Sequence, residues 1–308
     1  MDLNKAILYG QLVQEAYNVP TTDLKNRAGT TVTAERGPNK TTYEVIASIY
    51  ANDLATDAKK TGLTDTVSIG LLLWQASTGE AVIAIRGTEG FLEWFQDAKI
   101  GTEKCPFLAE AGETEEGFTD VYKSFAVGAL KGPSVTASLA TIFGTKQVNS
   151  LTVCGHSLGG ALATLQALDA AANSTNSKFK NPTVYTYASP RTGDAQFAST
   201  YNRLVPNTFR IANRVDLVPK LPLPPPYEHV QGLYKLSAIQ FFPPAILAEP
   251  NPLCEHVLET YLHLLSKRAG GKSLPLRPIC DTPGGLTKLW KLLRMEFRDV
   301  EKFTKGVR

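Results

Sequence analysis

Long apolar runs are missing from this sequence of 308 residues. No stretch reaches the roughly 18–20 consecutive apolar residues that a membrane-spanning helix requires, which argues against a transmembrane segment. The N-terminus, Met1 to Leu12, also lacks the basic start and the apolar core of a signal peptide. We therefore expect a cytoplasmic protein, or a secreted one whose signal peptide has been removed.

Net charge and cysteine are also scarce. The formal net charge is only +3, which argues against nucleic acid as the main partner. The cysteines are too few and too scattered for a disulfide scaffold, and their spacing does not match that of zinc ligands. We expect a buried free thiol at Cys154, which lies in a predicted strand, and no metal or cofactor. A disulfide among the others, Cys105, Cys254 and Cys280, is left open.

The remaining composition, 43% hydrophobic and 20% charged, is that of a globular protein with a substantial core. Strand-like runs alternate with helical patterns after residue 117, which predicts an α/β fold with a mostly parallel central sheet flanked by helices. There is no internal repeat and no clear linker, so we expect one domain over residues 1–308.

Hydrophobic periodicity indicates where the elements lie. Residues 18–40 and 101–116 are expected to be irregular, and the proline-rich segment 221–227 to be a stiff, extended loop. Helices are expected over residues 3–17, 117–130, 134–143, 161–168, 197–202 and 254–266. Strands are expected over residues 43–50, 67–74, 81–86, 148–154, 183–188, 208–212 and 232–242, with a hairpin turn at 77–80.

The most informative stretch joins a predicted strand to a predicted helix through Gly155-His156-Ser157-Leu158-Gly159. This G-x-S-x-G pattern is typical of a nucleophile elbow, in which the serine occupies a strained strand-to-helix turn. The residues two before and two after the serine must be small, because strand and helix come close there. The following helix directs its first amides to the place where a negative oxygen would develop. The alternative is a glycine-rich turn without chemistry.

A serine hydroxyl is a weak nucleophile unless a base removes its proton and a carboxylate orients that base. Only four histidines are available, and the elbow residue His156 is a poor candidate because it points away from the serine. His256 follows an irregular segment that can bend back to the site, and it is modestly favoured. His263 lies two turns further along and is expected to pack. His229 either lines the pocket or binds a loop carbonyl.

The acid is expected after the serine and before the histidine in the chain, as on other serine hydrolases with this strand-turn-helix motif. Asp216 stands directly after a predicted strand, where a loop at the carboxyl edge of the sheet would present it. Its alternative role is that of a turn or capping residue. Asp194 and Asp169 are weaker candidates, because one lies in a glycine turn and the other late in the elbow helix.

Further short motifs flank the elbow along the chain. They are Arg86-Gly87-Thr88, Glu93 to Asp97, Gly117 to Tyr122, Ala188 to Asp194, Asn213 to Pro219 and His256 to His263. Together, and in this order over about residues 5–265, they resemble the class 3 lipase family, the fungal-type triacylglycerol lipases with bacterial and plant relatives.

The resemblance implies an α/β-hydrolase fold and names the catalytic residues. It implies Ser157 as the nucleophile, Asp216 as the acid and His256 as the base, in agreement with the choice made from the residues. It also implies an oxyanion hole formed by the backbone amide of Leu158 and by Thr88.

The family also carries a short helical lid after the Arg-Gly-Thr turn, which falls here on residues 90–96. This segment is rich in apolar side chains, Phe91, Leu92, Trp94 and Phe95. A closed lid would bury these side chains over the substrate pocket, and an open one would expose them at a lipid surface. The alternative is an ordinary helix packed on the core.

The predicted function is hydrolysis of carboxylic esters through an acyl-enzyme, with triacylglycerol as the first-choice substrate. Phospholipase A1 and feruloyl-type esterase are the alternatives among enzymes, and a non-catalytic lipid- or protein-binding module is the alternative from another class. The basic amphipathic extension 284–308 either contacts a lipid surface or docks on the body. The sequence makes no prediction of the oligomeric state.

Overall fold

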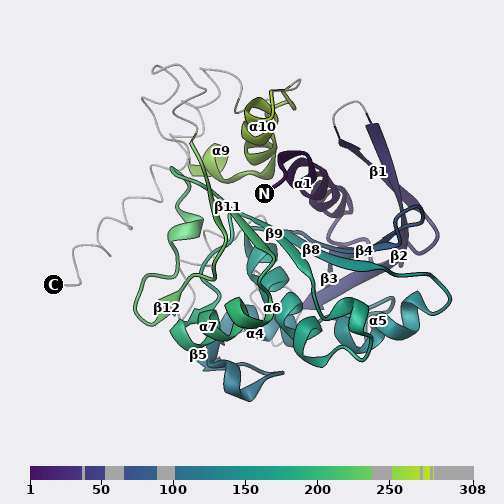
Figure 1. The fold of residues 1–308 in the computed structure, drawn as a ribbon, viewed down its shortest axis with the longest axis horizontal. Helices are drawn as coiled ribbons and strands as arrows, with labels where there is room; N and C mark the ends of the chain where they lie inside the picture. Colours follow the sequence, from purple (N-terminus) through teal and green to yellow (C-terminus); the bar gives the residue numbers. More distant parts are fainter. Residues whose placement is uncertain are drawn as a thin grey trace.

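The computed structural model of the chain describes residues 1–36, 39–52, 66–88, 101–237, 252–270, 273–277 and 280. A large sheet runs through the molecule in the strand order β1-β2-β3-β4-β8-β9-β11-β13, with β7 beside β2 (Figure 1). Its strands are β1 (Thr31–Arg36), β2 (Asn39–Asn52), β3 (Thr66–Gln75), β4 (Glu80–Ile85), β7 (Ala126–Val127), β8 (Ser150–His156), β9 (Thr183–Tyr187), β11 (Thr208–Asn213) and β13 (Leu233–Leu236).

The two halves of this sheet differ in strand direction. Strands β1 to β4 pair antiparallel, with the predicted hairpin between β3 and β4. Strands β4, β8, β9, β11 and β13 pair parallel. Parallel strands are covered on both faces, and in β4 every residue from Ala81 to Ile85 is buried. The carboxyl ends of the parallel strands meet at one edge, where the loops that follow them gather.

Helices cover both faces of the sheet (Figure 1). Along β4, Val82 and Ala84 belong to the apolar core under the first pair of helices, whereas Ile83 and Ile85 belong to the core on the other face. The first pair is α1 (Leu3–Asn18) and α10 (Leu258–Arg268); the other face carries α4 (Glu116–Lys123), α5 (Val135–Phe143), α6 (Leu158–Asn173) and α7 (Ala195–Leu204). This arrangement confirms the predicted α/β architecture.

Residues 101–116 are not irregular, which corrects the prediction for that segment. They contain β5 (Thr102–Lys104), the 3-10 helix η1 (Ala109–Ala111) and β6 (Glu113–Glu115). These strands join β10 (Gly193–Asp194) and β12 (Tyr227–Glu228) in a small antiparallel sheet. The strands are short and polar, and β6 pairs with residues about 80 positions later. Local periodicity therefore contains no signal for them.

Three further boundaries differ from the prediction. The expected loop over residues 18–40 contains β1, whose Thr-Val-Thr start pairs with β2. The helix expected over 117–130 ends at Lys123, because Ala126 and Val127 pair with β2 instead. The helix expected over 254–266 is split at Val257 into α9 (Pro252–His256) and α10. Because of this break, His256 at the end of α9 does not have to follow the axis of α10.

Several predictions fall outside the described residues. They are the lid over residues 90–96, the strand beyond residue 237 and the extension 284–308. The extent of a single domain to residue 308 likewise stays a prediction. Within the described ranges, no helix combines the length and the apolar character that crossing a bilayer demands.

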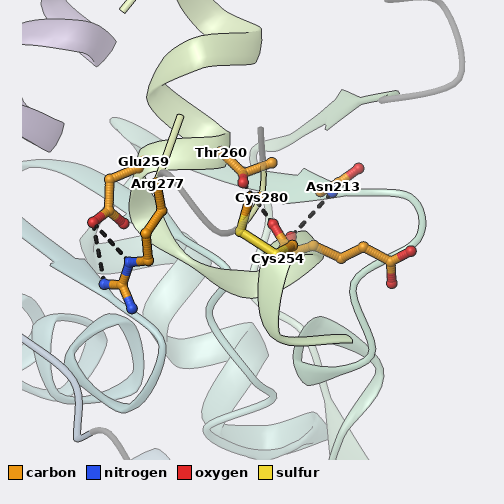
Figure 2. Close-up of a disulfide and its surroundings, with 7 residues drawn as sticks. Asn213, Cys254, Glu259, Thr260, Arg277 and Cys280 are labelled. Carbon is orange, nitrogen blue, oxygen red and sulfur yellow. Dashed lines mark hydrogen bonds and ion pairs between the residues drawn. A yellow bond between two sulfur atoms is a disulfide. The ribbon is translucent and has the colours of Figure 1, made fainter. Parts of the chain in front are cut away.

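A disulfide joins Cys254 in α9 to Cys280, with the two Cα atoms 5.5 Å apart (Figure 2). Two polar contacts hold the same short helix: Thr260 donates to the Cys254 carbonyl at 2.5 Å, and the Asn213 amide donates to the Glu255 carbonyl at 3.1 Å. The other cysteines, Cys105 and Cys154, are buried free thiols, as expected for Cys154. The position of α9 therefore depends on a covalent link as well as on packing.

Reduction of the Cys254–Cys280 disulfide should lower the free energy of unfolding by about 2–4 kcal/mol, because the link closes a loop across a separation of 26 residues. The measurement is denaturant unfolding with and without dithiothreitol. The double variant Cys254→Ser, Cys280→Ser serves as the control and should not respond to the reductant. Equal stability of the oxidised and reduced wild-type chain would contradict the prediction.

Candidate active site

The backbone at Ser157 is in an unusual conformation. Ser157 lies between β8 and α6 with φ 59° and ψ −128°, and a positive φ costs a residue with a side chain about 1–3 kcal/mol. Hydrogen bonds on both sides keep this conformation: the Ser157 amide donates to the Tyr187 carbonyl at 2.9 Å, and the Gly160 amide donates to the Ser157 carbonyl at 2.8 Å. The strain is local, and the turn presents the serine side chain at the carboxyl end of β8.

Glycine is required on both sides of this serine. A Cβ atom on Gly155 would lie 2.0 Å from the Gly159 carbonyl oxygen, and one on Gly159 would lie 2.4 Å from the Ile85 carbonyl oxygen. Both distances are far shorter than a van der Waals contact. The close approach of strand and helix that the pentapeptide predicts is therefore present.

The structure brings together the three residues that the sequence proposed as a set. His256 Nε2 lies 2.8 Å from Ser157 Oγ, and His256 Nδ1 lies 2.9 Å from Asp216 Oδ2. All three side chains are buried, Ser157 and Asp216 to within 1% of full burial. In this geometry Nδ1–H donates to the carboxylate, which leaves the lone pair of Nε2 free to accept the serine proton.

Asp216 accepts hydrogen bonds from two further donors besides His256. Its Oδ1 accepts the Val218 amide at 2.9 Å, and its Oδ2 also accepts the Tyr261 hydroxyl at 2.7 Å. Tyr261 accepts the Asn213 amide at 3.0 Å, and burial together with the Asp216 charge raises the Tyr261 pKa well above its usual value. Neutral donors thus orient the carboxylate without cancelling its charge. Sequence reasoning did not single out Tyr261, although it stands in the same motif as His256.

The elbow histidine supports the site from behind. His156 Nε2–H donates to the backbone carbonyl of His256 at 2.8 Å, and its Nδ1 accepts the Tyr17 hydroxyl at 2.8 Å. Tyr17 in turn accepts the Gly87 amide at 2.9 Å. Burial, with the nearby His256, lowers the His156 pKa well below its usual value, so the ring stays neutral. His156 therefore connects His256 to the turn after β4, a role that no local pattern in the sequence indicates.

The turn after β4 comes close to the serine. A Cβ on Gly87 would lie 2.9 Å from Ser157 Cβ, and Thr88 follows directly as a partly buried residue. Arg86 anchors the turn, since its guanidinium donates to the Gly87 and Val19 carbonyls at 3.0 and 3.3 Å. Leu158 begins α6, where a backbone amide has no partner within the helix. The Leu158 amide thus follows Ser157 directly, and the turn after β4 lies beside the serine.

The remaining candidates have structural contacts elsewhere. Asp169 accepts the Tyr122 hydroxyl at 2.6 Å, and Asp194 accepts the Phe197 amide at 2.7 Å as the N-cap of α7. His263 donates from Nδ1 to a carbonyl at 2.6 Å, as expected of a packed residue. The lid residues Phe91, Leu92, Trp94 and Phe95 lie outside the described residues.

His229 binds a loop carbonyl, which was one of its two expected roles. Its Nε2–H donates to the Pro219 carbonyl at 2.6 Å, and its ring also lines a groove beside Asp216. Burial first, then the charge of Arg210, lowers the His229 pKa to about 3.

Among the residues that the structure describes, no group of three or more histidine, cysteine or acidic side chains is arranged to hold a metal ion.

Comparisons with known proteins extend these observations. Residues 82–225 match the family model described as Lipase (class 3). The chain is 31% identical over 207 residues to phospholipase A1-II 2 of Oryza sativa subsp. indica, an alignment that covers 60% of this chain and 51% of the relative. It is also 31% identical over 183 residues to the secreted mono- and diacylglycerol lipase A of Penicillium cyclopium, with 59% of this chain and 55% of that relative covered.

The chain thus spans about half the length of these curated relatives. Among solved structures, it resembles the crystal structure of MDLA, in mutant form, from Penicillium cyclopium. That match has a TM-score of 0.59 at 26% identity and covers 77% of this chain and 80% of that one. The likeness therefore extends from the short motifs to the arrangement of the sheet and its helices.

Replacing Tyr261 with phenylalanine should lower the free energy of unfolding by about 1–3 kcal/mol, because the buried Asn213 amide and one Asp216 oxygen each lose a partner. Denaturant unfolding measures the change. Tyr234→Phe is the matched control, since Tyr234 is half-buried and its ring contact with Arg268 is kept. An effect of Tyr261→Phe as small as that of the control would contradict the prediction.

His229 should make the protein sensitive to acid. Its pKa is lower in the folded chain than its ordinary value of 6.5, so the stability that this neutral ring contributes is present above pH 6.5 and is lost as the pH falls below it. When the pH is lowered from 7 to 5, the decrease in the free energy of unfolding should be about 1–2 kcal/mol smaller for the His229→Gln variant than for the wild-type chain. An NMR titration of the His229 ring with a midpoint near pH 6.5 would contradict this account.

Proposed function

We propose that this chain, which belongs to the class 3 lipase family and has the α/β-hydrolase fold, hydrolyses carboxylic esters of apolar acyl chains. The observation that carries the proposal is the continuous hydrogen-bonded series from Ser157 Oγ to His256 Nε2, and from His256 Nδ1 to Asp216 Oδ2, at 2.8 and 2.9 Å. A buried serine, imidazole and carboxylate in this order form the arrangement that activates a serine hydroxyl.

Acylation begins when His256 Nε2 takes the Ser157 proton as Oγ attacks the ester carbonyl. The carbonyl oxygen becomes negative, and the backbone amides of Leu158 and Thr88 are proposed to donate to it. Each such donor contributes on the order of 3 kcal/mol to lowering the barrier. The Thr88 hydroxyl is proposed as a further donor to this oxygen. His256 then returns the proton to the alcohol oxygen, the ester C–O bond breaks, and the acyl group remains on Ser157.

Deacylation uses the same groups in the same order. His256 takes a proton from water, the hydroxide oxygen attacks the acyl carbon, and the proton passes to Ser157 Oγ as the acid leaves. Asp216 holds Nδ1 protonated throughout and stabilises the imidazolium that forms. Val218 and Tyr261 keep the carboxylate directed at His256, and His156 holds the His256 backbone. No step requires a metal or a cofactor.

The substrate class follows from the relatives. Their names describe phospholipases A1 and a mono- and diacylglycerol lipase, which are enzymes that release acyl chains from glycerolipids. We therefore propose a glycerolipid acyl ester, with triacylglycerol and its partial glycerides first and the phospholipase A1 reaction second. The apolar segment 90–96 is proposed as the lid, and the extension 284–308 is proposed either to dock on the body or to contact a lipid surface.

Ser157→Ala should lower kcat/KM for p-nitrophenyl butyrate by on the order of 10⁵-fold, because it removes the hydroxyl that is proposed to form the acyl-enzyme. Ser77→Ala, a change at an exposed serine of the β3–β4 turn, is the matched control and should leave the rate unchanged. A fluorophosphonate probe should label the wild-type chain and the control variant but not Ser157→Ala. Wild-type turnover by Ser157→Ala would refute the proposed mechanism.

The acyl preference is tested on esters from acetate to palmitate, beside emulsified triglyceride and phosphatidylcholine. Rates should rise with chain length and rise further above the solubility limit of the substrate. Hydrolysis confined to acetate and butyrate would contradict the glycerolipid assignment. Absence of turnover and of labelling by the intact chain would favour a binding module on the same fold.

A further inference from the structure

A groove of about 510 Å³ lies beside the loop that carries Asp216, and neither Ser157 nor His256 lines it. Its walls come from β11, β13, the chain between these two strands and the segment that follows β9. Positively charged side chains dominate the lining, with Asp216 as the one carboxylate among the lining residues. The cations are Arg191, Arg210, Arg214, Lys220 and Lys235.

The strand register explains how these side chains meet. Arg210 and Ala212 in β11 lie opposite Leu233 and Lys235 in β13. Ile211, between the two β11 residues, belongs to the core under α1 and α10. Because side chains alternate along a strand, Arg210 and Ala212 face the opposite side of the sheet, where they line the groove.

Arg210 is a buried cation without a carboxylate partner. Only 6% of its surface is exposed, and its Nε–H donates to the Val230 carbonyl at 3.3 Å. Within the part of the chain that the structure describes, its terminal nitrogens have no hydrogen-bond partner and no acid forms an ion pair with it. Burial and the nearby Arg191 lower its pKa to about 10, which still leaves it charged at neutral pH. Buried charges in proteins are normally paired.

The neighbouring groups do not neutralise this charge. Arg191 donates to the Lys220 and Pro222 carbonyls, which are neutral. The two oxygens of Asp216 are already taken by His256, Tyr261 and the Val218 amide. Burial and Asp216 raise the pKa of the adjacent Glu255 to about 7, so it is only partly ionised at neutral pH. The groove therefore carries a large excess of positive charge.

His229 also faces the groove but adds no charge. Its pKa of about 3 keeps the ring neutral near pH 7, and its Nε2–H is committed to the Pro219 carbonyl. The positive charge of the groove therefore comes from guanidinium and ammonium groups alone.

We propose that this groove is a binding site for the phosphate group of a phosphomonoester. Guanidinium groups match the oxygens of phosphate with paired hydrogen bonds, and lysines add point charges around them. The volume lies within the range of small-molecule sites and exceeds that of a lone phosphate ion, so a phosphate attached to a larger molecule fits. The site is separate from Ser157 and does not depend on the proposed hydrolase activity.

Isothermal titration of the full chain with inorganic phosphate, at constant ionic strength, tests the proposal. We expect one saturable site per chain. Arg210→Met should raise Kd at least tenfold, and Lys235→Gln about threefold to tenfold. Lys5→Gln, which removes one exposed charge from α1 on the other face of the sheet, is the matched control and should change Kd less than twofold.

The absence of saturable binding by the wild-type chain would overturn the proposal, as would equal Kd values for all folded variants. Circular dichroism and thermal unfolding establish which variants fold. If Arg210→Met does not fold, the double variant Arg214→Gln, Lys235→Gln replaces it, because both residues line the groove and are exposed. Its Kd should rise at least tenfold, and an unchanged value would again overturn the proposal.

Two further ligands test whether the phosphate group belongs to a lipid or to a water-soluble molecule. One is glycerol 3-phosphate, and the other is a short-chain diether phosphatidic acid, which has no ester to hydrolyse. Tighter binding of the diether lipid, in competition with inorganic phosphate, supports a lipid phosphomonoester as the ligand. Tighter binding of glycerol 3-phosphate supports a water-soluble one. Binding of neither, when inorganic phosphate does bind, would overturn the phosphomonoester and leave a simple anion site.

Discussion

The strained backbone of Ser157 is the constraint on which the rest of the site depends. Its positive φ turns the chain so sharply that β8 and α6 nearly touch, and only glycine fits at residues 155 and 159. The Tyr187 carbonyl of the neighbouring strand accepts the Ser157 amide and holds the turn. The geometry of this local motif therefore depends on the pairing of β8 with a strand that lies further along the chain.

The parallel half of the sheet supplies the other groups at the same edge. Gly87 follows β4, Ser157 follows β8 and Asp216 follows β11, so strand order alone brings these loops together. His256 does not follow a strand and needs other restraints. The Cys254 disulfide, the Asn213 amide and the ring of His156 hold α9 and its last residue. Several independent contacts thus limit the motion of the one group that is carried by a short helix.

The features that sequence predicted are those that short patterns encode. The glycines of the elbow and an aspartate placed directly after a strand led to Ser157 and Asp216, and the irregular segment before His256 modestly favoured that histidine. The features that it missed involve partners far apart in the chain. Tyr17 contacts His156 across 139 positions of the chain. Cys254 and Cys280 form a disulfide across 26 positions, and the helix α10 lies between them in the sequence. The break at Val257 was also missed, because the apolar spacing of α10 continues smoothly through it.

Asp216 stands between two regions with opposite electrostatic demands. On one side His256 requires a carboxylate that keeps its full charge, and on the other side five cations line a groove. An arginine paired directly with Asp216 would balance part of the positive charge in the groove. It would also weaken the attraction between the Asp216 carboxylate and the His256 imidazole. In the structure, neutral donors hold the carboxylate beside His256: the Val218 amide donates to Oδ1 and the Tyr261 hydroxyl to Oδ2. Among the residues that the structure describes, no carboxylate therefore forms an ion pair with the five cations of the groove, and an external anion would complete them.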